Sequence, residues 1–241
     1  ANMCSIEKRG KFFILTFTGE DEHRLNPTLI DQLLQSLRQV KSQSEPGSVL
    51  ITTSKGKFFS NGFDIPWAQS ISGGSEVKSM ELLFHMVELF KSVAIELISL
   101  PMPTIAAING HAAAAGMLLA LCHDYAMMRS DKGVFYMPEV DLGLAMPDYF
   151  AALFGDKVPS FETRRDLLLA GKKLKGGDAK NVNIVGSVYD SEDKLIDAAM
   201  LLAQNLSKRK WKGDNYKLIR MSLLPVSCQV LGIQSFKISK L

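Results

Sequence analysis

The stretch PTIAAINGHAAAAGMLLALC, residues 103–122, is the part of the sequence that decides the fold class. Its first part, TIAAI, is a continuous apolar run of the kind that forms a strand buried on both faces of a parallel sheet. An Asn-Gly pair and a row of small residues follow, and together they predict a tight turn. GMLLALC then has the apolar character of a buried helix. A buried strand that leads through a turn into a buried helix is typical of α/β proteins.

The segments before this stretch show the same alternation of strand and helix. Residues 11–17 and 48–53 have the β-branched and aromatic content of strands. Between them, Asn26 followed by Pro27 predicts the start of a helix, because Asn is a good N-cap and Pro suits the first helical position. Residues 77–99 carry apolar side chains at helical spacing, which predicts a long amphipathic helix.

From about residue 147 onward the pattern changes to helices. We therefore expect an α/β core over residues 1–190 and a helical C-terminal region over residues 191–241. Residues 207–220 form a basic cluster with two aromatic side chains. This cluster predicts either a solvated helix face or a binding site for a phosphate group.

The composition excludes several classes of protein. Hydrophobic residues make up 46% and charged residues 22% of the 241 residues, as in globular domains. A formal net charge of +3 is too small for a protein specialised in binding nucleic acid. The 3 cysteines are far apart, which argues against a disulfide framework or a zinc site, and no apolar run is long enough to span a membrane. We therefore expect no metal, no nucleic-acid partner and no membrane span.

Two loops could present backbone N–H groups to a substrate. The first is SNGFDI at residues 60–65, where a glycine after a strand lets N–H groups point into a cleft. The second is the small-residue turn at residues 109–117, which leads into the N-terminus of a helix. Two converging N–H groups would stabilise an enolate oxygen, and removing one such donor typically raises the barrier by about 3–4 kcal/mol.

Three motifs follow one another along the chain: GKFFSNGFDI at residues 56–65, the stretch at residues 103–122, and VFYMPEVDLGL at residues 134–144. In this order they resemble the crotonase, or enoyl-CoA hydratase/isomerase, superfamily over roughly residues 5–210. The resemblance implies a superhelical core of ββα units, assembly into homotrimers or dimers of trimers, and coenzyme A thioesters as substrates. Because coenzyme A is then part of the substrate, no separate cofactor is expected.

The resemblance also implies roles for individual residues. By position in the motifs, the backbone N–H groups of Phe63 and Ala115 would form an oxyanion hole, and Glu139 would be the catalytic acid and base. The first loop would also meet the adenine-ribose end of coenzyme A. The residues expected to bind the substrate are Ser60, Asn61, Gly62, Phe63, Asp64, Ile65, Ala115 and Leu118.

Family hydratases use two glutamates, and only one of the two positions is a glutamate here. The position in the small-residue helix is Leu118, and the position in the third motif is Glu139. Adding water across a conjugated double bond needs both carboxylates, whereas moving a double bond from C3 to C2 needs one. The resemblance therefore implies a Δ3,Δ2-enoyl-CoA isomerase of fatty-acid β-oxidation. An apolar Leu118 would exclude water and raise the pKa of Glu139.

Other activities stay open at this point. Asp148 could replace Glu139 as the base, or it could cap the helix that starts near Tyr149. An enoyl-CoA hydratase or 3-hydroxyacyl-CoA dehydratase would need a second carboxylate, which Leu118 argues against. The chain could also be a catalytically silent acyl-CoA-binding protein, or a thioester hydrolase or dehalogenase with Asp148 as the nucleophile.

The chain ends in Ser239, Lys240 and Leu241. This tripeptide is an address that the peroxisomal import receptor reads. We therefore expect the import receptor as a partner and the peroxisome as the location.

Overall fold

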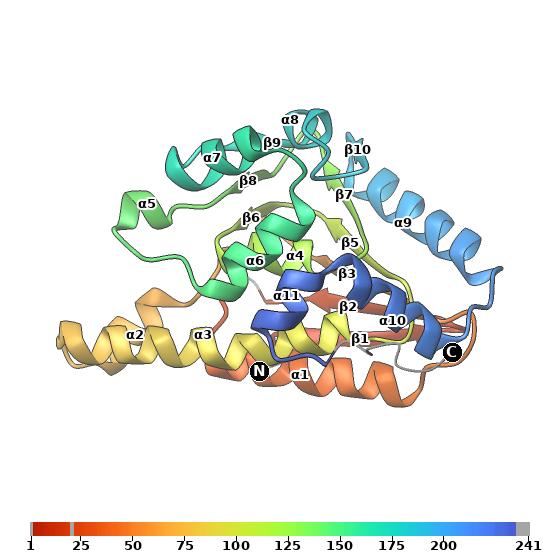
Figure 1. Ribbon diagram of the computed structural model, residues 1–241, viewed down its shortest axis with the longest axis horizontal. Helices are drawn as coiled ribbons and strands as arrows, with labels where there is room; N and C mark the ends of the chain where they lie inside the picture. Colours follow the sequence, from red (N-terminus) through yellow and green to blue (C-terminus); the bar gives the residue numbers. More distant parts are fainter. Residues whose placement is uncertain (1, 20–21, 235–241) are drawn as a thin grey trace.

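The computed structural model describes residues 2–19 and 22–234, and it confirms the expected α/β class. Two sheets form the centre of the molecule and helices surround them (Figure 1). Ser239, Lys240 and Leu241 lie outside the described residues. Within the described ranges, no helix combines the length and the apolar character that crossing a membrane requires.

The larger sheet has 6 strands in the order β1-β2-β3-β5-β7-β10. The first pair, β1 with β2, is antiparallel, and every other neighbouring pair is parallel. Every residue of β3 and β5 is buried, as expected for strands covered on both faces. The strands are β1 (Cys4–Arg9), β2 (Phe12–Phe17), β3 (Val49–Ser54), β5 (Thr104–Ile108), β7 (Tyr125–Arg129) and β10 (Ser187–Tyr189).

The smaller sheet has 4 short strands in the order β4-β6-β8-β9. They are β4 (Phe58–Ser60), β6 (His111–Ala113), β8 (Val134–Tyr136) and β9 (Leu174–Lys175). The first three are parallel to one another, and β9 is antiparallel to β8. The small residues at 109–117 were expected to form only a turn. Three of them form β6 instead, because β4 and β8 lie on either side and accept its backbone hydrogen bonds.

Helices follow the strands in a repeated order. The sequences β3-β4-α2, β5-β6-α4 and β7-β8-α5 each place one strand in the larger sheet, one in the smaller sheet and then a helix. The helices are α1 (Pro27–Ser42), α2 (Ile65–Ile71), α3 (Glu76–Ile98), α4 (Ala115–Leu121), α5 (Glu139–Leu142), α6 (Asp148–Lys157), α7 (Phe161–Leu169), α8 (Gly176–Asn181), α9 (Glu192–Ser207), α10 (Gly213–Leu223) and α11 (Pro225–Val230).

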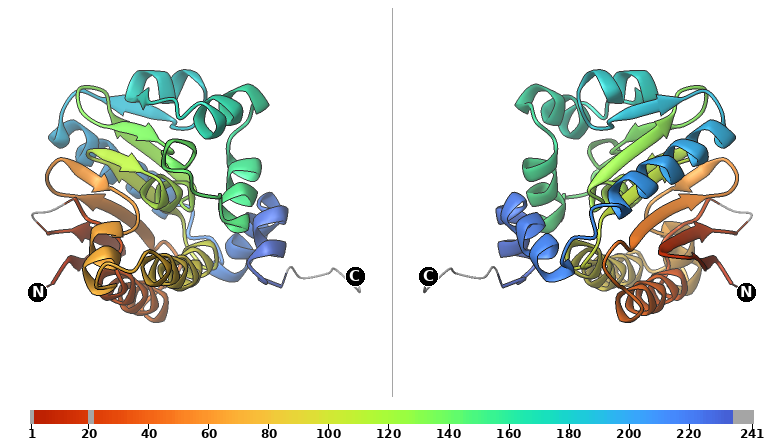
Figure 2. Two further views of the ribbon diagram at one scale, coloured as in Figure 1. Left: turned by 90° about the vertical axis from the view of Figure 1, so that its left-hand side faces the viewer. Right: turned by 90° about the vertical axis from the view of Figure 1, so that its right-hand side faces the viewer.

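The two faces of the larger sheet are covered by different helices. One face carries α9, whose Leu195, Ala199 and Ala203 pack with Ile51 and Ile105 of the central strands. The other face belongs to the main core, to which α1, α3 and α4 contribute (Figure 2). The division of the chain at residue 190 stays a prediction. Because α9 covers the sheet, part of the C-terminal region packs directly on the α/β core.

An ion pair joins α10 to the core. Arg220 of α10 is buried, and its guanidinium donates to both carboxylate oxygens of Asp124, at 2.6 and 2.7 Å. It also donates to the carbonyl oxygens of Ile98, the last residue of α3, and of Leu100 and Met102 just after that helix. Burial by itself would raise the pKa of Asp124, but the bonds and charge of Arg220 outweigh it and the pKa is lowered. The guanidinium therefore fixes the C-terminal helices to the start of β5 and β7.

Replacing Arg220 by Met is expected to lower the free energy of unfolding by about 3–5 kcal/mol, because it leaves the Asp124 carboxylate without its buried partner. Urea unfolding followed by circular dichroism measures this change. Arg209 is exposed and stacks on Trp211, so Arg209→Met is the matched control and should change stability by less than about 1 kcal/mol. Equal effects of the two substitutions would contradict the assigned role of Arg220.

Candidate active site

The smaller sheet brings the predicted catalytic residues to one place. Phe63, Ala115 and Glu139 each follow the carboxyl end of a strand, β4, β6 and β8 respectively. These strands are neighbours and parallel, with Ser60 paired to Ala112 and Ala113 paired to Tyr136. The carboxyl ends of neighbouring parallel strands lie at one edge of a sheet, which is where open α/β sheets bind ligands. Three segments far apart in sequence therefore meet at this edge.

The first two loops touch through their backbones. A Cβ added at Gly116 would lie 2.1 Å from the carbonyl oxygen of Ser60, and one added at Gly62 would lie 2.9 Å from the Cβ of Ala114. Gly62 also has a φ of +74°, which other residues rarely adopt. Only glycine fits at either position without moving the backbone, so these two residues set the distance between the loops.

Ala114 turns the chain from β6 into α4. Its φ of 50° and ψ of −123° are unusual for a residue with a Cβ, and such strain occurs mostly at functional sites. Its N–H donates to the carbonyl oxygen of Tyr136 at 3.0 Å, which ties this turn to the end of β8. Its side chain cannot cap the helix, so the first N–H groups of α4 stay available.

The two predicted oxyanion-hole donors have no partner in the described part of the chain. Leu25 and Asp64 make the backbone hydrogen bonds on either side of Phe63, and the N–H of Phe63 itself donates to none of residues 2–19 and 22–234. The same holds for the N–H of Ala115, the first residue of α4. Both residues are buried, so an oxygen atom of a ligand could satisfy both donors.

Glu139 has the properties of a buried catalytic acid and base. It is the first residue of α5 and is 9% exposed. One carboxylate oxygen, Oε2, is buried and has no hydrogen-bond partner among the described residues. Burial raises the pKa of its carboxyl, and a hydrogen bond from its own backbone N–H lowers it by less. A raised pKa suits a group that must both accept and donate a proton near neutral pH.

Asp148, the alternative base, has a different environment. Its side chain is exposed, and Oδ1 accepts a hydrogen bond from the N–H of Tyr149 at 2.7 Å. The helix begins at Asp148, next to the expected start near Tyr149, but Pro147 and not Asp148 occupies the N-cap position. The carboxylate therefore lies in the first turn of α6, where its negative charge interacts favourably with the positive end of the helix dipole.

Several of the residues expected to bind substrate hold the loops in place. The hydroxyl of Ser60 is fully buried and donates to the carbonyl oxygen of His23 at 2.8 Å. Asp64 caps α2 by accepting from the N–H of Trp67 at 3.0 Å. Asn61 accepts from the hydroxyl of Tyr136, and Leu118 is fully buried in α4. A direct contact of these side chains with coenzyme A stays a prediction.

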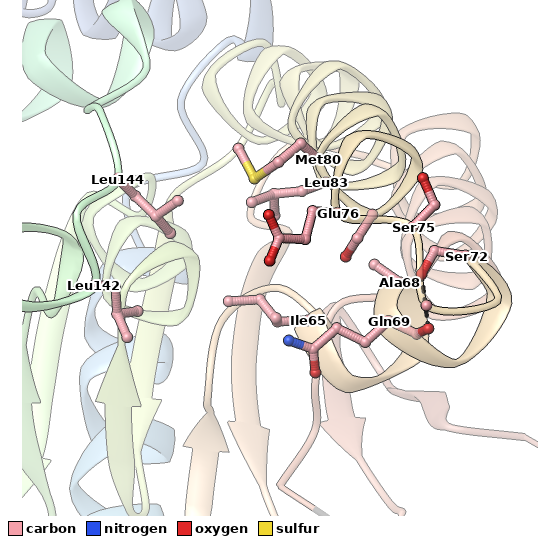
Figure 3. A pocket seen from close by; sticks show the side chains of 12 residues that line it. Ile65, Ala68, Gln69, Ser72, Ser75, Glu76, Met80, Leu83, Leu142 and Leu144 are labelled. Carbon is pink, nitrogen blue, oxygen red and sulfur yellow. Dashed lines mark hydrogen bonds between the residues drawn. The ribbon is translucent and has the colours of Figure 1, made fainter.

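A pocket of about 520 Å³ lies next to the site (Figure 3). Its walls are α2, the first turns of α3 and the segment after Glu139. Ile65, the last residue of the first loop, faces Leu142 and Leu144 across the opening (Figure 3). Ile65 comes two residues after Phe63, so this wall of the pocket belongs to the same loop as one predicted oxyanion-hole donor.

Two lysines beside the first loop, Lys57 and Lys173, were not among the residues expected from the sequence to bind the substrate. The Lys173 ammonium lies 5.0 Å from the ring centroid of Tyr136, whose hydroxyl bonds Asn61. The Lys57 ammonium lies over the ring of Phe58. Burial is the largest cause of the lowered pKa of His111, and the positive charges of Lys57 and Lys173 lower it further, so both lysines lie near the His111 ring. Both ammonium groups are exposed, and neither forms an ion pair with a described residue. Lys57 stands within the first motif, whereas only the tertiary structure places Lys173 there.

Arg220 is the last residue of the basic cluster at residues 207–220. It is buried and forms an ion pair with Asp124, so its guanidinium is not available to a phosphate group. Within residues 2–19 and 22–234, no group of His, Cys, Asp and Glu side chains is arranged to hold a metal ion.

Comparisons with known proteins identify similar sequences. The family model described as enoyl-CoA hydratase/isomerase matches residues 16–215. Enoyl-CoA delta isomerase 2, peroxisomal, from Arabidopsis thaliana is 53% identical over 97% of both chains. Enoyl-CoA delta isomerase 3 from the same plant is 54% identical over 96% of both chains. Enoyl-CoA delta isomerase 1, peroxisomal, is 45% identical over 92% of this chain and 90% of its own.

Solved structures share the fold at low sequence identity. A protein of the enoyl-CoA hydratase/isomerase family from Pseudomonas syringae superposes with a TM-score of 0.81 at 20% identity, covering 95% of each chain. A probable enoyl-CoA hydratase from Mycobacterium tuberculosis superposes with a TM-score of 0.83 at 17% identity, covering 96% of this chain and 92% of its own. These likenesses confirm the expected ββα superhelical fold.

The buried Glu139 carboxylate predicts a dependence of stability on pH. Because its pKa is raised in the folded state, the unfolded chain ionises first as pH rises. The contribution of the neutral Glu139 carboxyl to the free energy of unfolding is therefore fully present below about pH 4.3, the pKa of a glutamate in the unfolded chain. It is lost as pH rises through the higher pKa of the folded state. Glu139→Gln should stabilise the protein at neutral pH by on the order of 1 kcal/mol, and this gain should disappear near pH 4.

Thermal unfolding at several pH values measures this difference. Asp148→Asn is the control, because its exposed carboxylate should give no gain at neutral pH. A Glu139→Gln variant that is no more stable than the wild type at any pH would mean that the carboxylate is better solvated than its burial indicates.

Proposed function

This chain belongs to the enoyl-CoA hydratase/isomerase family, and on that premise we propose that it is a Δ3,Δ2-enoyl-CoA isomerase of fatty-acid β-oxidation. The names of the three relatives at 45–54% identity support an isomerase. Two of these relatives are named peroxisomal, which supports the same compartment for this chain. A homotrimer or dimer of trimers stays a prediction.

One observation carries the proposal. Glu139 is a single buried carboxylate with an unpartnered oxygen, and the position of a second carboxylate in α4 is the fully buried Leu118. One carboxylate can move a proton between two carbon atoms of the substrate, whereas adding water to a double bond calls for two. The apolar surroundings also exclude water from the intermediate.

The proposed reaction moves one proton and one double bond. The Glu139 carboxylate takes a proton from C2 of the 3-enoyl thioester, and the electrons of the C2–H bond pass toward the thioester oxygen. The N–H groups of Phe63 and Ala115, which are free within the described residues, would donate to this oxygen and stabilise the dienolate. The Glu139 carboxylic acid then returns the proton at C4, and the double bond ends between C2 and C3.

Glu139→Gln should lower kcat for a 3-enoyl-CoA by a factor of about 10²–10⁴, because an amide cannot shuttle the proton. The assay follows the rise in ultraviolet absorbance as the double bond becomes conjugated with the thioester. Asp148→Asn should keep most of the activity, since that carboxylate is exposed and lies in the first turn of α6. Activity that survives in Glu139→Gln and is lost in Asp148→Asn would move the base to Asp148.

The same assay tests the remaining alternatives. A hydratase would lower the absorbance of a 2-enoyl-CoA, and a silent binding protein would change neither substrate.

We also propose that Lys57 and Lys173 bind phosphate groups of coenzyme A, because both are exposed cations without an ion-pair partner among the described residues.

Lys173→Ala should raise KM for a 3-enoyl-CoA by about tenfold, which corresponds to losing one charge-assisted hydrogen bond. The KM for a 3-enoyl thioester of N-acetylcysteamine should not change, because that substrate has no phosphate. Lys41 in the last turn of α1 is exposed and serves as the control, since Lys41→Ala should change neither KM. An equal rise of KM with both substrates would exclude a phosphate contact.

A further inference from the structure

The pocket beside the site changes from apolar to polar along its length. The helices α2 and α3 form a hairpin, and each contributes residues three or four positions apart, which share one helix face. At the end near Phe63 these residues are apolar, namely Ile65, Ala68, Met80 and Leu83. Leu142 and Leu144 complete this end from the opposite side (Figure 3).

At the other end, where the two helices join, the lining is polar. Besides Gly74, it consists of Gln69, Ser72, Ser75, Glu76 and Ser79. The rise of a helix is about 1.5 Å per residue, so the polar turn lies roughly 10 Å beyond Ile65 along α2. An unbranched chain that enters at the oxyanion hole would thus meet apolar walls first and polar groups later.

Glu76 is the charged group in this lining. It is the first residue of α3, it is exposed, and its carboxylate points into the pocket (Figure 3). No described residue forms an ion pair or a side-chain hydrogen bond with it. An unpaired carboxylate keeps its hydration, and placing methylene groups against it would remove that water without compensation.

We propose that Glu76 and the polar turn between α2 and α3 set an upper limit to the length of the acyl chain that this pocket accepts. The inference rests on the proposed function, since it takes the acyl chain of a coenzyme A thioester as the occupant. Chain segments beside the apolar end contribute binding free energy, and segments that reach Glu76 contribute none.

The first measurement is kcat/KM of the wild type for 3-enoyl-CoA substrates from hexenoyl to hexadecenoyl. Each methylene group buried at the apolar end should raise kcat/KM by about fourfold. The rise should stop once the chain reaches Glu76. A rise that continues unchanged to hexadecenoyl would overturn the proposal.

Glu76→Leu is expected to raise the ratio of kcat/KM for hexadecenoyl over hexenoyl by at least about tenfold, because two or three more methylene groups find an apolar wall. Glu76→Gln removes the charge alone and should give a smaller rise. Glu81 is also exposed on α3 and does not line the pocket, so Glu81→Leu should leave the ratio unchanged. An unchanged ratio in Glu76→Leu, or an equal loss with every chain length, would overturn the proposal.

A binding experiment separates this inference from the proposed function. Calorimetric titration with saturated acyl-CoAs from hexanoyl to hexadecanoyl needs no turnover. In one outcome no 3-enoyl-CoA is isomerised, but the affinity for saturated acyl-CoAs stops rising at one chain length and Glu76→Leu extends that length. The proposed function then fails and the length limit stands. If isomerisation occurs but affinity does not depend on chain length, the length limit fails and the proposed function stands.

A second variant tests the apolar end. The side chain of Leu142 is 55% exposed, so Leu142→Asp should not affect folding. It should lower the affinity for decanoyl-CoA by at least about tenfold, because it places a charge where the chain would lie. Affinity equal to that of the wild type would mean that the chain binds elsewhere.

Discussion

The constraint on which the rest of the structure depends is the close approach of two backbone segments, the loop after β4 and the turn before α4. A Cβ at Gly116 would lie 2.1 Å from the carbonyl oxygen of Ser60, so these segments can meet only without that side chain. Their contact brings the N–H groups of Phe63 and Ala115 to the same edge of the smaller sheet. At this contact Ala114 has a strained conformation, which its hydrogen bond to Tyr136 helps to hold in place.

The carboxyl groups of Asp124 and Glu139 have opposite environments, and the contrast accounts for the different parts that we assign to them. Asp124 receives both arms of the Arg220 guanidinium and the N–H of Thr104, so its pKa is lowered and its charge is stabilised. Burial of Glu139 is opposed only by its own backbone N–H, and its pKa is raised. A carboxylate with full partners fixes α10 to the core, whereas one whose oxygen has no partner among the described residues can exchange a proton.

The predicted reacting groups and the walls of the adjoining pocket come from different parts of the fold. The predicted reacting groups follow short strands that two neighbours hold in register, which limits their movement. The walls of the adjoining pocket come from α2 and α3, a helical hairpin at one end of the molecule (Figure 1). A substitution on this hairpin changes a side chain in the pocket without moving the strands. Under the proposed function, a change of acyl preference on this hairpin therefore leaves the proposed site of proton transfer in place.

Local signals in the sequence predicted the α/β class, the start of α1, the extent of α3 to within one residue, and the three motifs that carry Phe63, Ala115 and Glu139. Helix caps, apolar spacing and small-residue turns are signals of this kind. The sequence did not predict β1, whose polar residues alternate without a clear pattern, or β6, whose small residues become a strand only between β4 and β8. Only the tertiary structure decided that Glu139 is buried with a free oxygen, that Asp148 is exposed, and that Glu76 and Lys173 lie near the site. Burial and charge depend on residues distant in sequence, and no local pattern records which of them will be neighbours.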